Sequence, residues 1–296
     1  MNRQMNHDGG TVAAPILVTG GTGRLGRLVV PRLLDAGRDV RVLSRQRQDA
    51  ADDVEYVIGD LLTCEGVERA VDGVGTILHL AGAANAKGDD EATRNLVRAA
   101  ARAGVQHVVH ISVIGADRVP LGYFKSKLEA EQAVVDSGLP FTILRAAQVH
   151  DLVLTMVQAM AKLPVIPVPG GVRFEPVDAD EVAARLAALT LGEPSGMVSD
   201  LTGPEVHGMD DLIRDYLRQH GKRRLLVPFR MPGKAGRAYR AGGNLSIDGA
   251  ATGKRTWEDF LAEQVNFPSD TEPALETPGH TDDGYEVNKR INRLFD

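Results

Sequence analysis

The sequence predicts a doubly wound α/β fold, in which helices cover both faces of a parallel sheet. Apolar runs typical of buried strands alternate with amphipathic runs typical of helices through the first half of the chain. Helical runs stop at Gly37, Gly104 and Gly138, and glycine is the usual residue at a helix C-terminus. The chain has 296 residues, of which 43% are hydrophobic, so it is long enough to bury a full core.

The first half contains six expected strands, each followed by a turn or a helix. We predict strands at residues 13–20, 39–44, 54–60, 76–82, 107–115 and 141–146. Three clear helical patterns occupy residues 24–37, 89–103 and 123–138. Strands that alternate with helices in this way are typical of parallel pairing.

The pattern loosens after about Asp151. We expect a helix to Lys162, a proline- and glycine-rich pair of short strands in residues 163–177, a helix from Asp178, and further helices near Met209 and Thr256. The expected organisation is a flexible N-terminus (1–14), a nucleotide-binding domain (15–150), a smaller substrate lobe packed on the same core (151–266), and an acidic, poorly ordered tail (267–296).

Composition excludes several classes of function. The formal net charge of −6 and the pI near 5.8 argue against a nucleic-acid or membrane partner, because both need a basic face. Cys64 is the only cysteine, so neither an intrachain disulfide nor a thiolate metal site is expected, and no metal is predicted. The polar N-terminus and the lack of a long apolar run favour a cytoplasmic protein. We expect a monomer or homodimer that acts on a small molecule.

A glycine pattern follows the first strand directly. Gly20, Gly23 and Gly26 form GxxGxxG between a predicted strand and a predicted helix. Glycines at these positions give a tight turn and let the backbone approach a pyrophosphate at the helix N-terminus. The pattern therefore predicts a dinucleotide cofactor.

The end of the second strand favours NADPH over NADH. An NAD-specific site usually has a carboxylate there, whereas this strand ends with Ser44 and Arg45. Guanidinium groups suit a 2′-phosphate, and Arg24 approaches the same phosphate from the glycine turn. Asp60, after the third strand, has two open interpretations: it accepts a hydrogen bond from the adenine amino group, or it caps the next helix.

A second group of residues is suited to reducing a carbonyl or a quinone. The fifth expected strand carries Ser112. Tyr123 begins the following helix, which carries Lys127 one turn later on the same face. We expect the Lys127 ammonium and the nicotinamide to lower the phenol pKa from about 10 toward neutrality, which makes Tyr123 a general acid. Ser112 would donate a second hydrogen bond to the substrate oxygen. Gln148 and His150 are expected at the pocket mouth as substrate contacts.

These motifs together resemble the short-chain dehydrogenase/reductase superfamily. The segments that carry the likeness are VTGGTGRLG, GDL, LAG, Ser112 with YxxxK, and ILRAAQVHD; the phrase ISVIGADRVPLGYFKSKLEAEQAV is more similar to its atypical NmrA-like branch of NAD(P)H-binding proteins. The resemblance implies a Rossmann-type fold, with Ser112, Tyr123 and Lys127 as the catalytic set. The implied cofactor contacts are Gly20, Thr22, Gly23, Arg24, Leu25, Gly26, Arg45, Asp60, Leu61, Ala81, Gly82 and Lys127.

Three functions remain open at this point. The first is an NADPH-dependent oxidoreductase, the second a non-catalytic redox sensor or co-regulator of the NmrA type, and the third a sugar-nucleotide epimerase or dehydratase. The intact Ser/Tyr/Lys set favours the enzyme, and the arginines count against the epimerase, which retains NAD. One departure is that only ten residues separate Ser112 from Tyr123, a shorter gap than many catalytic members have.

Overall fold

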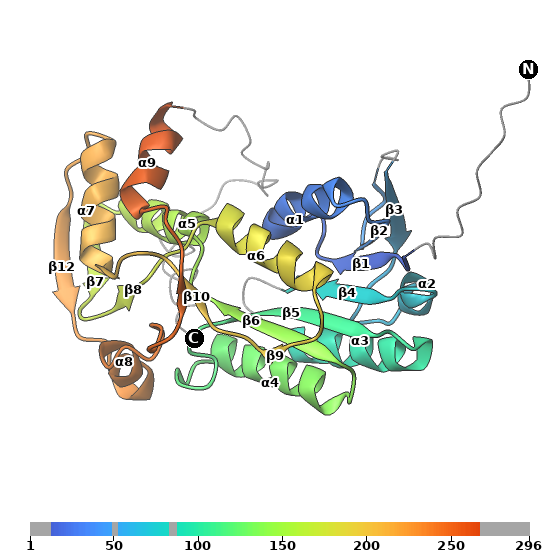
Figure 1. Cartoon of the computed structure of the whole chain (residues 1–296). Helices are drawn as coiled ribbons and strands as arrows, with labels where there is room; N and C mark the ends of the chain where they lie inside the picture. Colours follow the sequence, from blue (N-terminus) through green and yellow to red (C-terminus); the bar gives the residue numbers. More distant parts are fainter. Residues whose placement is uncertain (1–12, 49–52, 83–87, 267–296) are drawn as a thin grey trace, which may run out of the picture.

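The computed structural model describes residues 13–48, 53–82 and 88–266. The acidic tail and nearly all of the expected N-terminal segment lie outside the described residues. A parallel sheet with helices on both faces forms the centre of the described structure (Figure 1), which confirms the doubly wound α/β fold.

The main sheet has the strand order of a dinucleotide-binding fold. Across the sheet the strands lie in the order β13-β10-β6-β5-β4-β1-β2-β3, and β9 also pairs with β6. Every pair in this sheet is parallel. The strand order reverses between β1 and β4, where a crevice opens at the carboxyl ends of the strands. The strands are β1 (Ile16–Thr19), β2 (Val40–Ser44), β3 (Val54–Ile58), β4 (Thr76–His79), β5 (His107–Val113), β6 (Phe141–Ala146), β9 (Gly196–Met197), β10 (Leu201–Thr202) and β13 (Ala251–Thr252).

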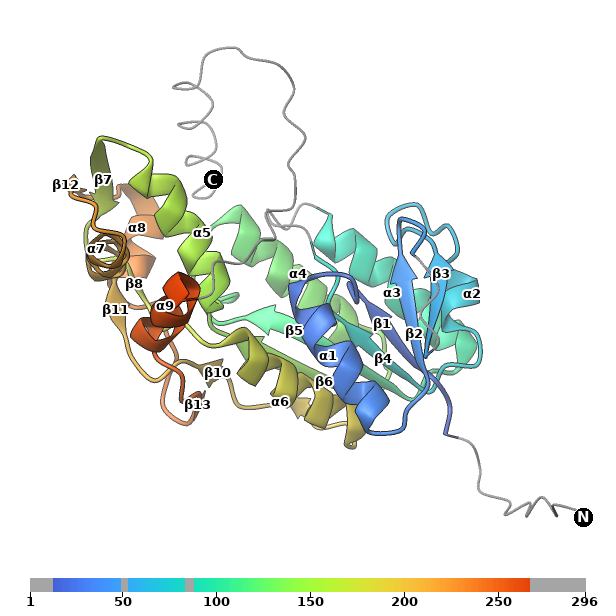
Figure 2. The ribbon, with the colours of Figure 1, turned by 90° about the horizontal axis from the view of Figure 1, so that it is seen from above.

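Helices cover the two faces of this sheet. One face carries α1 (Arg24–Asp35) and α6 (Ala179–Leu191), and the other carries α2 (Val67–Val71), α3 (Asp89–Ala103) and α4 (Gly122–Asp136) (Figures 1 and 2). Successive strand side chains point to opposite faces, so Leu17 and Val18 belong to different core clusters. Among the described helices, none is long and apolar enough to cross a membrane.

A smaller lobe lies beyond the carboxyl end of β6, at the left of Figure 1. It contains α5 (His150–Ala161), α7 (Met209–Gln219), α8 (Gly233–Arg240) and α9 (Trp257–Asn266). Two short strand pairs complete it: β7 (Val165–Pro169) with β12 (Leu225–Phe229), and β8 (Arg173–Phe174) with β11 (His207–Gly208). The lobe has its own core, in which Trp257 and Ile166 are almost fully buried.

The chain crosses between the two parts more often than the sequence predicts. The short strands β7 and β8 do not pair with each other but with the later strands β12 and β11. Pro167 and Pro169 lack the backbone N–H that a β7–β8 hairpin ladder needs. In addition, β9, β10 and β13 belong to the main sheet, where β9 and β10 pair with the edge of β6 that would otherwise be exposed.

Candidate active site

The glycine turn has the shape that the sequence predicts. Gly20 has a φ of +71°, and the Gly23 N–H donates to the Gly20 carbonyl at 3.0 Å. A Cβ on Gly26 would overlap the Gly20 carbonyl oxygen and the Gly21 backbone, and a Cβ on Gly20 would lie 2.8 Å from the Ala81 nitrogen. These contacts require glycine at both ends of the turn, and they place the N-terminus of α1 against the carboxyl ends of β1 and β4.

A cavity of about 520 Å³ opens in front of this turn. It is lined by the turn, by the carboxyl ends of β1 to β4, by the start of α3 and by Val149. Except for Lys127, each cofactor contact expected from the sequence lines the cavity: Gly20, Thr22, Gly23, Arg24, Leu25, Gly26, Arg45, Asp60, Leu61, Ala81 and Gly82. The structure brings these residues together, and their contact with a dinucleotide stays a prediction.

The charged residues at this cavity differ in their surroundings. Arg45 is exposed and has no ion pair within the described ranges, whereas Arg24 pairs with Asp151 of α5. The Asp60 carboxylate accepts a hydrogen bond from the Leu62 backbone at 2.8 Å, in a turn that precedes α2. Because Gly66 stands at the N-cap of α2, the helix-cap interpretation of Asp60 is wrong.

None of the three expected catalytic residues is among the described residues that line the cavity. Ser112 is 2% exposed, and its hydroxyl has no hydrogen-bonding partner among the residues that the structure describes. Tyr123 is partly buried in the first turn of α4, and the Lys127 ammonium lies 5.9 Å from the centroid of its ring. A Cβ on Gly82, which lines the cavity, would lie 2.8 Å from that ammonium. Lys127 is therefore separated from the cavity by Gly82.

The surroundings of Tyr123 raise the pKa of its hydroxyl in the cofactor-free protein. Lys127 forms an ion pair of 2.7 Å with Asp89, so its charge is largely neutralised. Burial, followed by the negative charge of Asp89 and by Tyr239, raises the pKa of the Tyr123 hydroxyl above its ordinary value. In the cofactor-free protein Tyr123 therefore keeps its proton at physiological pH, and a pKa near neutrality beside a bound nicotinamide stays a prediction.

Two buried histidines on neighbouring strands of the main sheet stack on each other. The rings of His79 on β4 and His110 on β5 lie 5.0 Å apart. His79 bonds to the hydroxyls of Thr19 at 2.7 Å and of Thr93 at 2.9 Å. Burial and the nearby Lys127 lower the pKa of His79 to about 3, and burial, His79 and Lys127 lower that of His110 as well. Both rings are thus neutral in the folded protein.

This stack predicts that the protein loses stability in acid. The unfolded chain protonates these histidines near pH 6.5, whereas the folded chain resists protonation. These histidines therefore do not lower the unfolding free energy above about pH 6.5. Below it, the unfolding free energy falls as the pH drops toward about 3, by at most about 1.4 kcal/mol per pH unit for each histidine. We expect His110→Leu to flatten the dependence of the unfolding free energy on pH between 6.5 and 4.5, measured by urea unfolding. The exposed-site control His220→Leu should follow the wild type; equal slopes for all three proteins would contradict the prediction.

The two expected substrate contacts are not brought together at the cavity. His150 is fully buried, with its ring 5.0 Å from that of Phe260 and its Nδ1 3.8 Å from Asp178. The first turn of α5 directs this ring into the core of the lobe, and His150 does not line the described cavity, so its contact with a substrate stays a prediction. The buried Oε1 of Gln148 has no partner in the described part of the chain, and a substrate contact there stays a prediction.

The sequence does not single out Asp89, which lines the cavity and pairs with Lys127, one of the expected catalytic residues. Its side chain is 6% exposed. In the sequence, Asp89 is the first of three consecutive acids at the start of a helix. Such acids usually indicate a helix N-terminus and nothing more. Only the packing of α3 against α4 reveals the pairing.

The fold and the site together define a dinucleotide-binding protein, and comparison with known proteins agrees. The NAD(P)H-binding family matches residues 20–188. The chain is 34% identical over 200 residues to a (4-alkanoyl-5-oxo-2,5-dihydrofuran-3-yl)methyl phosphate reductase of Streptomyces griseus, covering 64% of this chain and 68% of the relative. The protein described here therefore belongs to the NAD(P)H-binding family.

Two solved structures show how widely the fold is used. The NADPH complex of the quinone oxidoreductase QOR2 from Escherichia coli has a TM-score of 0.73 and 21% identity, with 85% of this chain and 100% of that chain covered. The NAD complex of UDP-glucose 4-epimerase from Thermus thermophilus has a TM-score of 0.64 and 22% identity, with 87% and 100% covered. Since reductases and epimerases share the fold, the site must distinguish between them.

Proposed function

We propose that the protein is an NADPH-dependent oxidoreductase of the short-chain dehydrogenase/reductase superfamily, in its NmrA-like branch, and that it reduces a small carbonyl or quinone. The observation that carries the proposal is the position of Tyr123, which keeps its proton beside the Lys127–Asp89 pair, next to Gly82 of the cavity wall. A site that only binds a dinucleotide has no need of a protonated phenol at this place.

The residues around the cavity fit NADPH. The glycine turn lets the N-terminus of α1 pack closely against the strands and face the cavity, where its backbone N–H groups suit a pyrophosphate. Arg45 offers a guanidinium without an ion pair among the described residues to a 2′-phosphate. Lys127 is the expected contact of the nicotinamide ribose. NADPH bound there supplies a hydride to the substrate.

The chain's own residues supply the proton and the hydrogen bonds. Tyr123 acts as the general acid, and its raised pKa keeps the proton available until the substrate oxygen becomes basic. The Ser112 hydroxyl, which is buried and has no partner within the described ranges, donates to the same oxygen. Asp89 holds Lys127 at 2.7 Å and fixes it near the phenol.

The similar proteins support a reductase. The Streptomyces griseus relative is named a reductase, and QOR2 is an NADPH-dependent quinone oxidoreductase. The epimerase alternative rests on the shared fold and on the same Ser/Tyr/Lys residues. Arg45 at the end of β2, where an NAD site usually has a carboxylate, favours the NADPH enzyme.

A direct assay tests the proposal. Purified protein should oxidise NADPH in the presence of members of a carbonyl and quinone panel, and a parallel titration should show that the cofactor binds. Binding of NADPH without turnover of any substrate would favour the redox sensor. Retention of NAD through purification, with conversion of a sugar nucleotide, would favour the epimerase.

Arg45→Ala should reduce the preference for NADPH. The guanidinium forms a charge-assisted hydrogen bond with the 2′-phosphate, which is worth roughly 1.5 to 3 kcal/mol. We therefore expect NADPH to bind about 10- to 100-fold more weakly to the variant, while NADH affinity stays unchanged. Fluorescence titration of both cofactors checks this. The matched control is Arg98→Ala, an exposed arginine on α3; equal affinities for the two cofactors in the wild type would contradict the assignment.

A further inference from the structure

An apolar surface remains exposed on the outer side of the lobe. Leu225, Val227 and Phe229 occupy alternate positions of β12 and are 64%, 44% and 43% exposed. Val165, the partner of Leu225 on β7, is 46% exposed. We call these four residues the β12 face. The opposite side of the same strand pair is buried in the lobe core, where Ile166 is fully buried.

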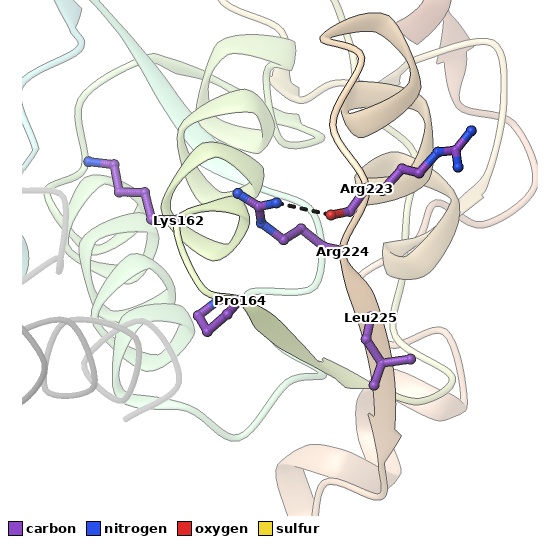
Figure 3. Close-up of a pocket in the computed structure, with 5 residues that line it drawn as sticks. All are labelled: Lys162, Pro164, Arg223, Arg224 and Leu225. Carbon is purple, nitrogen blue, oxygen red and sulfur yellow. Dashed lines mark hydrogen bonds between the residues drawn. The ribbon is translucent and has the colours of Figure 1, made fainter.

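Cations surround one end of the β12 face. Lys162 follows the end of α5, and Arg223 and Arg224 precede β12; with Pro164 and Leu225 they line a groove of about 640 Å³. Figure 3 shows the Arg223 and Arg224 side chains pointing in opposite directions from the start of the strand. None of these three cations has an ion pair within the described ranges.

The basic character extends beyond the groove. Between Asp215 and Asp248 the sequence contains no acidic residue, and its basic residues there are Arg218, Lys222, Arg223, Arg224, Arg230, Lys234, Arg237 and Arg240. This is unusual in a chain whose formal net charge is −6. An exposed apolar strand face with cations at its end is suited to an acidic segment that carries a few apolar side chains.

The chain itself contains such a segment. Residues 270–286 include Leu275 and Tyr285, contain no Lys or Arg, and carry the acids Asp270, Glu272, Glu276, Asp282, Asp283 and Glu286. The segment follows α9, which packs against α7; α7 also packs against β7, the partner of β12. One helix, about 10–12 Å across, thus separates α9 from the β7–β12 pair. Ten residues of extended chain after α9 span about 33 Å.

We propose that residues 270–286 dock on the β12 face, with their carboxylates paired to the cations that surround its end, Lys162, Arg223 and Arg224. Two other occupants are less suited to the charges. A second copy of this face would bring two cationic grooves together, and an anionic bilayer would repel the rest of an acidic chain. The docking is independent of the reaction proposed above.

Zero-length carbodiimide cross-linking of the full chain tests the proposal. We expect low-salt cross-links from Lys162 or Lys222 to carboxylates of residues 270–286, located by mass spectrometry. Hydrogen exchange of residues 225–229 should be about tenfold slower than in a full-length variant with Asp270→Asn, Glu272→Gln, Glu276→Gln, Asp282→Asn, Asp283→Asn and Glu286→Gln. The double variant Arg223→Glu, Arg224→Glu should lose the cross-links, whereas the control Arg98→Glu, Arg185→Glu should keep them.

The same measurements distinguish the proposed segment from the two other occupants, a second copy of the chain and a membrane. A mixture of ¹⁵N-labelled and unlabelled chains distinguishes cross-links within one chain from those between two, and cross-links found only between chains would assign the face to a second copy. Protection of residues 225–229 only on addition of phosphatidylserine vesicles would assign it to a membrane. Either result, or equal exchange in the wild type and the neutralised variant, overturns the proposal.

Discussion

Tyr123→Phe is expected to lower the turnover of NADPH-dependent reduction by about 10²- to 10⁴-fold, the usual effect of losing a general acid. The substitution keeps the ring that packs against Phe124 at 5.3 Å and faces Lys127 at 5.9 Å. It removes only the hydroxyl, so NADPH affinity and the folded structure should be nearly unchanged. Steady-state kinetics, with cofactor titration beside them, measure the two effects separately.

The pH dependence provides a second test of the same residue. Because burial and Asp89 raise the pKa of Tyr123, the phenol keeps its proton until the pH exceeds that raised value. The reductive rate should therefore not decline through loss of this proton below about pH 10, the ordinary pKa of a tyrosine. Phe124→Leu is a matched control that alters the neighbouring ring and leaves the acid in place. A Tyr123→Phe protein with full reductase activity would contradict the mechanism.

The sequence predicts the parts of the molecule that local patterns determine. Asp89–Ala103 is a helix with Gly104 at its end, as predicted, because the apolar spacing and the terminal glycine are local signals. The glycine turn between β1 and α1 is equally local. The position of Arg45 at the end of β2 follows from the length of that strand.

Contacts between distant segments lie beyond such patterns. The Lys127–Asp89 pair joins residues 38 positions apart, and no local signal distinguishes Asp89 from the other acids in the first turn of α3. The same holds for the pairing of β7 with β12 and of β8 with β11. His150 follows β6 at the expected place, but the rotation of α5 about its axis determines which way the ring points, and the ring packs on Phe260. The sequence therefore predicts the cofactor cavity better than the groups beside it.

Gly23→Val should abolish the binding of both NADPH and NADH while the protein still folds. Gly23 stands at the N-cap of α1 with extended backbone angles (φ −77°, ψ 179°), which any residue can adopt. A Cβ there meets only the Gly20 carbonyl oxygen, at 3.1 Å, so the turn itself can accommodate a side chain. The valine methyl groups, however, occupy the cavity in front of the helix N-terminus, which is the space that the pyrophosphate needs.

We expect Gly23→Val to lower both affinities by more than about 100-fold, equivalent to about 2.7 kcal/mol, with cooperative thermal unfolding retained. Gly26→Ala is the structural comparison, because its Cβ overlaps the backbone of Gly20 and Gly21 and should lower the melting temperature. Loss of NADPH and NADH binding together also distinguishes the pyrophosphate turn from Arg45, whose removal affects NADPH alone. A folded Gly23→Val protein that binds both cofactors normally would show that the turn has only a structural role and that the dinucleotide binds elsewhere.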